Sequence, residues 1–251
     1  FSQGTSYFTE LNGNIEIDIL NAMEFDASCL GNHEFDNGMD ELARRLGNLN
    51  VPVVCANYSF KGSPLDGLVK PYVILEKAEK KIGIIGLLTD VTSVVDKDIA
   101  AQLSYRNPAE AANEYAKILK VDQRCDLVIC LTHLGFDGEP YVDTELAAQT
   151  RNVDVIVGGH SHTMLKDLHN VYNLDGEPVT IVTDWKWGLN IGNLKVNFTP
   201  QRLYGKYLDL LPEKVFSYDG SWFPYPAYSD RAGWAEILGS NADYLISVGE
   251  K

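Results

Sequence analysis

Short apolar runs alternate with amphipathic stretches over residues 14–198 of this 251-residue chain. The apolar runs predict buried strands, at 27–30, 51–55, 72–76, 81–88, 126–131, 153–157, 179–183 and 189–198. The amphipathic stretches predict helices, at 14–23, 39–49, 111–119 and 143–150. In the first helix, Ile15, Ile19 and Met23 share the face expected to meet the core. Strands that alternate with helices in this way indicate an α/β fold built from βα units.

Capping and turn residues define several of these boundaries. Asn107 can cap the third helix, Pro108 suits its first position, and Glu110 completes a start similar to a capping box. The charged stretch 77–80 separates two strands in the manner of a hairpin. The dipeptide Asp175-Gly176 predicts a turn between two further strands.

Polar clusters that contain glycine follow three of the predicted strands. They are Gly31-Asn32-His33-Glu34, Thr132-His133-Leu134-Gly135 and Gly158-Gly159-His160-Ser161-His162. Because active sites in open α/β sheets gather at the carboxyl ends of strands, we expect these clusters to meet. Four of the five histidines lie in them, whereas His169 lies outside and is interpreted as a surface or structural residue.

The placement of these histidines indicates a metal site. A single histidine is more often a hydrogen-bonded structural residue than a ligand, but four that share one kind of position favour ligation. Imidazole suits zinc, manganese, iron or cobalt. His160 and His162 would face the same way on a regular strand, whereas Gly158 and Gly159 allow them to fan out toward two ions. Two ions about 3.5–4 Å apart can clamp a phosphoryl group during hydrolysis.

Composition limits the classes of binding partner and indicates the domain organisation. The net charge of −14 argues against binding to nucleic acid or to an anionic membrane. Binding of phosphorylated substrates is still compatible with this charge, because metal ions can supply local positive charge. The four cysteines lie in apolar stretches without a CxxC pair and are interpreted as buried free thiols. Residues 200–251 lack the βα rhythm, so we divide the chain into a domain at 1–199 and an extension of unknown role at 200–251.

The three polar clusters resemble the metal-site motifs of calcineurin-like metallophosphoesterases. The longer string Gly31–Asp36 (GNHEFD), together with Phe1–Thr5 (FSQGT), is similar to the 5'-nucleotidase branch of that family. The resemblance covers about residues 1–198. It implies a layered α/β/β/α sandwich with the clusters at strand ends.

The resemblance also implies roles for six residues. The implied ligands are Asn32, His133 and His160 for one divalent ion and His162 for the other. His33 is implied to contact the phosphate, with Asp36 orienting it as a catalytic dyad. On spacing alone Asp36 is equally typical of a surface turn beside 37–38, and the resemblance favours the dyad.

The family also places a D-x-H motif at the end of its first strand, and a G-D pair whose Asp bridges the two metals. In this sequence both motifs and the first strand would fall before Phe1. We therefore expect the ion at His162 to be held weakly or to be absent in this chain.

The function implied by the resemblance is metal-dependent hydrolysis of phosphate monoesters, above all 5'-nucleotides, by a water activated by two ions such as zinc or manganese. It further implies a separate nucleotide-binding C-terminal domain and a periplasmic or cell-surface location. No residue is assigned to substrate binding. Two alternatives stay open: a non-catalytic binding module with the same fold, and an enzyme that hydrolyses sulfur esters.

Overall fold

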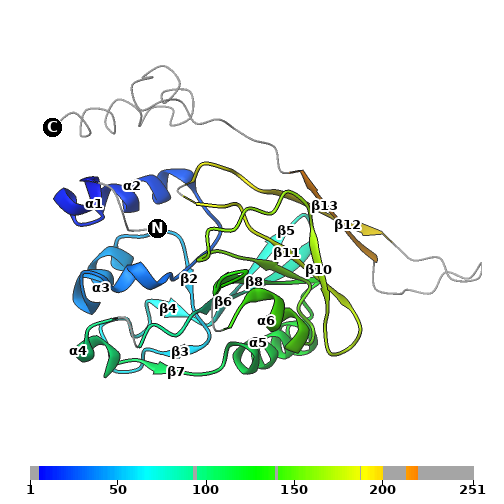
Figure 1. Cartoon of the computed structure of the whole chain (residues 1–251), viewed down its shortest axis with the longest axis horizontal. Coiled ribbons are helices and arrows are strands. Elements are labelled where there is room, and N and C mark those ends of the chain that lie inside the picture. Colours follow the sequence, from blue (N-terminus) through cyan, green and yellow to red (C-terminus); the bar gives the residue numbers. More distant parts are fainter. Residues whose placement is uncertain (1–5, 93–94, 139–140, 187, 200–212, 220–251) are drawn as a thin grey trace, which may run out of the picture.

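The computed structural model describes residues 6–92, 95–138, 141–186, 188–199 and 213–219. Its helices are α1 (Ser6–Leu11), α2 (Asn14–Met23), the 3₁₀ turn η1 (Asn32–Phe35), α3 (Met39–Gly47), α4 (Lys97–Ala100), α5 (Pro108–Lys117), the π turn η2 (Ile118–Asp122) and α6 (Asp143–Gln149). Its strands are β1 (Ser28–Cys29), β2 (Val53–Val54), β3 (Tyr58–Ser59), β4 (Val69–Lys70), β5 (Tyr72–Lys77), β6 (Lys80–Leu88), β7 (Ser104–Tyr105), β8 (Leu127–His133), β9 (Val155–Val157), β10 (His169–Tyr172), β11 (Pro178–Val182), β12 (Asn193–Thr199) and β13 (Glu213–Asp219). They form an α/β fold of sheets with flanking helices, as predicted (Figure 1).

The larger sheet has the strand order β10-β11-β9-β8-β6-β5. Its central strands β11, β9, β8 and β6 run parallel, while β10 and β5 pair antiparallel at the two edges. The hairpin predicted around residues 77–80 is the β5–β6 pair, in which Lys77 lies opposite Lys80. The turn predicted at Asp175-Gly176 joins β10 to β11.

A parallel sheet of β1, β2 and β4 packs against the larger one. Backbone meets backbone at Gly86 of β6, whose carbonyl accepts a hydrogen bond from the Ala56 N–H at 2.7 Å. A Cβ at this position would overlap the carbonyl oxygen of Val54, so only glycine allows the sheets to come this close. The buried amide of Asn57 adds a second link, because it donates to the Leu88 carbonyl and accepts from the Leu88 N–H.

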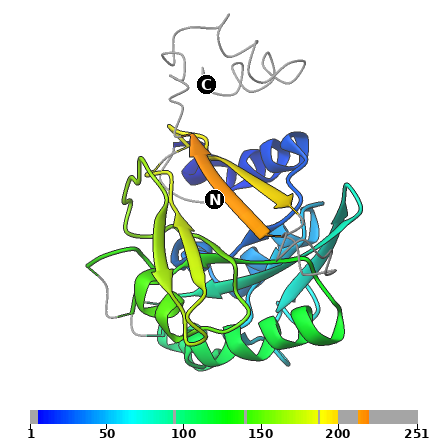
Figure 2. The same ribbon diagram turned by 90° about the vertical axis from the view of Figure 1, so that its right-hand side faces the viewer.

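Helices cover the outer faces of the two sheets. Figures 1 and 2 place α5 and α6 on one side of the molecule and α1 and α2 on the opposite side. Side chains of α5 and α6 share one core with the larger sheet, and side chains of α3 share a second core with β2. The layer order is therefore α/β/β/α.

The start of α5 confirms the predicted cap. Asn107 Oδ1 accepts hydrogen bonds from the backbone N–H groups of Ala109 at 2.8 Å and Glu110 at 3.2 Å. Pro108 occupies the first helical position, where its missing N–H removes nothing from the helix.

Two sequence-based expectations need correction. Helix α2 has the predicted bounds but buries Ile15 and Ile17, whereas Met23 is 49% exposed. The core therefore meets the N-terminal half of the helix, at Ile15 and Ile17, and leaves its last residue near solvent. The strands expected at 27–30 and 51–55 shorten to two residues each, because the ladder between β1 and β2 has only two registered pairs.

Strand β12 begins at Asn193, four residues later than predicted, and pairs antiparallel with β13 along its whole length (Figure 2). β13 belongs to the predicted extension at 200–251, the rest of which lies outside the described residues. The domain boundary at residue 199 therefore stays a prediction.

None of the described helices is long and apolar enough to cross a membrane. The cysteines are free thiols, as predicted: Cys55, Cys125 and Cys130 are buried and Cys29 is half-buried.

Candidate metal centre and catalytic dyad

Strand pairing brings the three polar clusters together. β8 runs to His133 itself, two residues further than predicted, because its pairing with β6 continues to Leu88 opposite His133. β9 is the parallel neighbour of β8, which places the segment 158–162 beside the end of β8. Asn32 begins η1 shortly after β1 and approaches from the smaller sheet.

The side chain of His133 adjoins those of Asn32 and His160. His133 Nε2 lies 2.8 Å from Asn32 Oδ1, and the ring centroids of His133 and His160 are 4.8 Å apart. An ion with bonds of about 2.0–2.2 Å holds neighbouring donor atoms roughly 3 Å apart, so the spacing of Asn32 Oδ1 and His133 Nε2 suits one divalent ion. An amide oxygen can only accept, so a hydrogen bond between these two atoms requires the tautomer that carries a proton on His133 Nε2.

The surroundings of His133 favour its neutral form. Burial lowers the pKa of His133 to about 3, and the neighbouring His160 contributes in the same direction. The imidazole is therefore neutral at physiological pH, and neutral imidazole is the form that binds metals.

Gly31 allows the close approach of His133. A Cβ at Gly31 would lie 3.1 Å from Cε1 of His133 and 2.7 Å from Oε2 of Glu34. Glu34 is 1% exposed, and its Oε2 accepts the N–H of Gly31 at 2.5 Å. This buried carboxylate fixes the start of η1, and with it the position of Asn32.

His33 and Asp36 form a hydrogen-bonded pair at the surface. Nδ1 of His33 lies 2.9 Å from Oδ2 of Asp36, and the two side chains are 46% and 43% exposed. The residues are three apart across the 3₁₀ turn η1, in which positions i and i+3 lie above one another. With Nδ1 engaged by Asp36, Nε2 is the ring atom that can contact a substrate.

Both histidines after β9 have left-handed backbone, with φ of 77° at His160 and 54° at His162. This region is uncommon for residues other than glycine, and such strain clusters at functional sites. The ring of His160 adjoins His133. His162 is exposed, and within the described residues no hydrogen bond or ring contact joins it to the other three predicted ligands. Its assignment to a second ion stays a prediction.

The donor set is small. Across the described ranges, no group of three His, Cys, Asp or Glu side chains is arranged to hold a metal ion. Asn32, His133 and His160 instead offer two imidazoles and one amide oxygen. Three protein ligands with an open position are typical of a catalytic zinc site, so the residues present fit one divalent ion.

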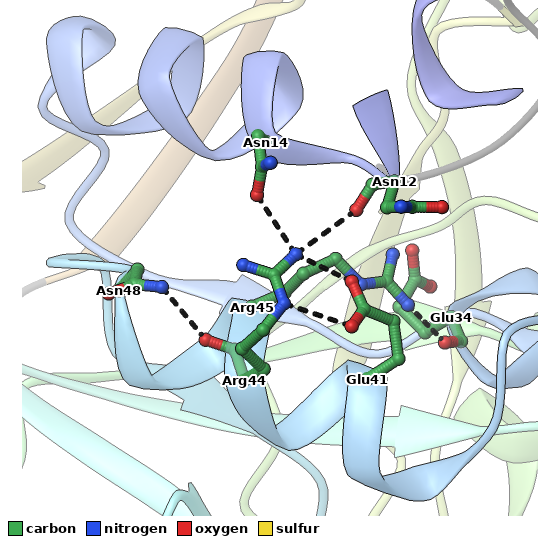
Figure 3. A network of polar contacts seen from close by, with 7 residues as sticks. All are labelled: Asn12, Asn14, Glu34, Glu41, Arg44, Arg45 and Asn48. Atoms are coloured by element: carbon green, nitrogen blue, oxygen red, sulfur yellow. Dashed lines mark hydrogen bonds and ion pairs between the residues drawn. The ribbon is translucent and has the colours of Figure 1, made fainter. Parts of the chain in front are cut away.

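A buried arginine bonds to the 3₁₀ turn η1, which carries His33 and leads to Asp36 (Figure 3). Arg45 of α3 is 0% exposed, and its Nη2 donates to the main-chain oxygen of Glu34 at 2.9 Å. Its neighbour Arg44 is exposed and binds Glu41 on the same helix and Asn14 of α2. The guanidinium of Arg45 therefore links α3 to the turn that carries the dyad.

Sequence reasoning missed two buried charged residues near the site, Arg45 and Asp143, both 0% exposed. Each lies in an amphipathic helix among other charged residues, a pattern typical of a solvated face. No local signal separates them from surface residues, because their burial depends on distant parts of the chain.

Comparison with known proteins agrees with this architecture. Residues 6–164 match the family model described as calcineurin-like phosphoesterase. The chain is 34% identical over 210 residues to a probable 5'-nucleotidase of Treponema pallidum (strain Nichols), covering 78% of this chain and 35% of that protein. It is 32% identical over 213 residues to a snake venom 5'-nucleotidase of Naja atra, covering 78% and 39%. The crystal structure of a 5'-nucleotidase precursor from Thermus thermophilus has a TM-score of 0.78 at 28% identity, covering 99% of this chain and 49% of that one.

The chain spans between 35% and 49% of the length of these three proteins. The family match includes all three polar clusters, and the solved structure shares the same layered sheets. The chain therefore belongs to the calcineurin-like phosphoesterase family.

Proposed function

We propose that this chain carries the site of a metal-dependent hydrolase that cleaves phosphate monoesters, with 5'-nucleotides as its substrates. The supporting observation is the position of the His33–Asp36 pair beside Asn32, His133 and His160. Asn32 and His33 are consecutive, and the pKa of His133 is lowered by burial and, to a smaller extent, by charge on His33, so the dyad borders the three donor side chains.

In the proposed reaction, a water oxygen bonds to phosphorus while the ester P–O bond breaks, which gives an alcohol and inorganic phosphate. His33, in its protonated form, stabilises negative charge on the transferring phosphoryl group or on the leaving oxygen. Asp36 holds the ring in that orientation through the contact at Nδ1. Asn32, His133 and His160 would hold one divalent ion and His162 a second, and such ions would supply positive charge for activating water and neutralising phosphate oxygens.

The nucleotide specificity rests on the relatives, which are named as 5'-nucleotidases. We propose that the nucleoside is recognised by a separate C-terminal domain, in line with the greater length of those proteins. A periplasmic or cell-surface location accords with the venom relative and belongs to the same proposal.

The test is an assay of ester hydrolysis by the purified natural protein. The protein is treated with a chelator, reloaded with manganese or zinc, and given AMP, p-nitrophenyl phosphate or a sulfur ester. We expect phosphate release from AMP that chelation abolishes and metal restores. His169→Ala, which changes a histidine outside the clusters, is the matched control and should keep this activity.

Two outcomes would contradict the proposal. Release from the sulfur ester alone would favour an enzyme that hydrolyses sulfur esters. Metal binding without release from any ester would favour a non-catalytic binding module.

A further inference from the structure

Asp143 is a buried acid that contacts two segments of the candidate site. It is the first residue of α6, it is 0% exposed, and it lies outside the three polar clusters. Its side chain meets the strand that ends at His133 and the segment that leads to His160.

The first contact is with the strand that carries His133. Asp143 Oδ1 accepts a hydrogen bond from the hydroxyl of Thr132 at 2.7 Å, and Thr132 directly precedes His133. The backbone N–H of Asp143 donates to the carbonyl of Gly135 at 2.8 Å. Asp143 is therefore bonded to the chain on both sides of His133.

The second contact is with Gly158, which follows β9. A Cβ at Gly158 would overlap Oδ2 of Asp143, so only glycine fits beside this carboxyl. The N–H of Gly158 donates to the carbonyl of Val182 at 2.8 Å, which fixes it against β11. Asp143 and Val182 together set the path of the chain two residues before His160.

A carboxyl in this position opposes folding. Within the described residues Oδ2 of Asp143 has no hydrogen-bond partner, and burial raises the pKa of this carboxyl to about 7. A residue that served only to fill the space would be apolar, because an incompletely bonded buried polar group destabilises the fold. Local choices that oppose stability are typical of functional sites.

We infer that Asp143 is a positioning residue: by bonding Thr132 and packing against Gly158, it sets the arrangement of His133 and His160 that a metal ion requires. The metal part of this inference rests on the proposed function, whereas the geometric part does not.

Other polar contacts also join the segment that follows β8 to the segment that follows β9. The N–H of Phe136 donates to Ser161 Oγ at 2.9 Å, and Ser161 Oγ lies 2.8 Å from Thr163 Oγ1. Thr163 in turn donates to Asp137 at 2.8 Å. These contacts lie nearer the surface, so Asp143 is the buried member of the set.

The first experiment uses metal-free protein with ¹⁵N-labelled histidine. The Nε2–H of His133, bonded to Asn32, should give a slowly exchanging imidazole N–H signal, assigned by its loss in His133→Ala. Asp143→Ala should abolish this signal or shift it beyond its linewidth. Asp143→Asn, which keeps an acceptor for Thr132, should retain it.

Leu146→Ala is the matched control, because Leu146 is an equally buried residue of the same helix. This substitution should lower Tm and leave the imidazole signal in place. An unchanged signal in Asp143→Ala would overturn the inference, as would the absence of the signal from the wild-type protein. The result therefore separates positioning from general loss of stability.

The second experiment measures Co²⁺ affinity by calorimetry in the same variants. Asp143→Ala should weaken binding about 10–100-fold, the usual effect of removing a group that orients metal ligands. Asp143→Asn and Leu146→Ala should stay close to wild type. An unchanged Kd in Asp143→Ala would refute the inference and leave the proposed function intact. Absent Co²⁺ binding in the wild type would refute the proposed function, while the imidazole signal would still decide the positioning role.

Discussion

His133 Nε2 lies 2.8 Å from Asn32 Oδ1, although 101 residues separate the two in the chain. His133 ends a strand of the larger sheet, and Asn32 follows a strand of the smaller one. The candidate metal site therefore depends on how the two sheets stack, and residues far from any ligand can change its geometry.

Removing His133 should remove divalent metal from the purified protein. Its imidazole adjoins both Asn32 and His160, so His133→Ala takes away the central donor. Elemental analysis of protein purified without added chelator measures the effect, with His169→Ala as the control that keeps its metal. Equal metal content in the two variants would show that the ion is held elsewhere.

Removing the imidazole of His33 should lower kcat and leave metal content unchanged. We expect His33→Asn to reduce kcat by about 10²–10⁴-fold, the usual contribution of a positioned acid or base. Asn37→Ala, an exposed neighbour in the same turn, should behave as wild type. Steady-state kinetics and elemental analysis are run on the same samples. Loss of metal from His33→Asn would assign this residue to the ligands instead of the dyad.

Gly86→Ala should destabilise the fold through a clash between the two sheets. The new methyl would overlap the carbonyl of Val54, and overpacking of this kind costs about 1–3 kcal/mol or more. The control is Gly47→Ala at the end of α3, where nothing lies within 4 Å of the added Cβ. Urea unfolding should show a loss of stability for the first variant and a change below ~1 kcal/mol for the second. Similar losses would mean that the sheets do not meet at Gly86.

Arg45→Ala should destabilise the protein far more than Arg44→Ala. Arg45 is buried and donates to the main-chain oxygen of Glu34, and truncation of a large buried side chain typically costs about 2–5 kcal/mol. Arg44 is exposed, and exposed ion pairs contribute roughly 0–1 kcal/mol. The adjacent arginines thus form a matched pair for chemical denaturation. Equal effects would contradict the burial of Arg45.

Asp143→Asn should stabilise the metal-free protein increasingly as pH rises from about 4 to 7. Burial raises the pKa of this carboxyl from 3.8 to about 7, so in that window the unfolded chain has lost the proton that the folded chain keeps. Stability therefore falls with rising pH in the wild type, by up to about 4 kcal/mol from this group. The amide introduced by Asp143→Asn does not titrate, so the variant does not lose stability through this group as pH rises. A difference in unfolding free energy that is constant over this window would show that Asp143 ionises normally.

Much of the fold follows from local sequence patterns. The start of α5 at Asn107 and Pro108 is set by a side chain that bonds the first turn. The β5–β6 hairpin and the bounds of α2 also agree with the pattern. These features depend on neighbours a few residues apart, which a single sequence displays directly.

The composition of the candidate site was also visible in the sequence. Asn32, His133 and His160 were predicted to meet because each lies at the end of a strand, and the structure brings them together. The spacing of His33 and Asp36 alone favoured neither a catalytic pair nor a surface turn, and the family resemblance favoured the pair. Their contact at 2.9 Å confirms the geometry of that pair.

Only the tertiary structure decided which charged residues are buried. Arg45 and Asp143 have the sequence context of surface residues, yet the chain encloses both. It also decided that Met23 is exposed and that the two sheets touch at Gly86. Helical and strand periodicities describe which face a residue occupies, but they do not specify what packs on that face. What packs on a face depends on contacts between segments far apart in the chain. These contacts determine the free energy of burying a charge or a methyl group.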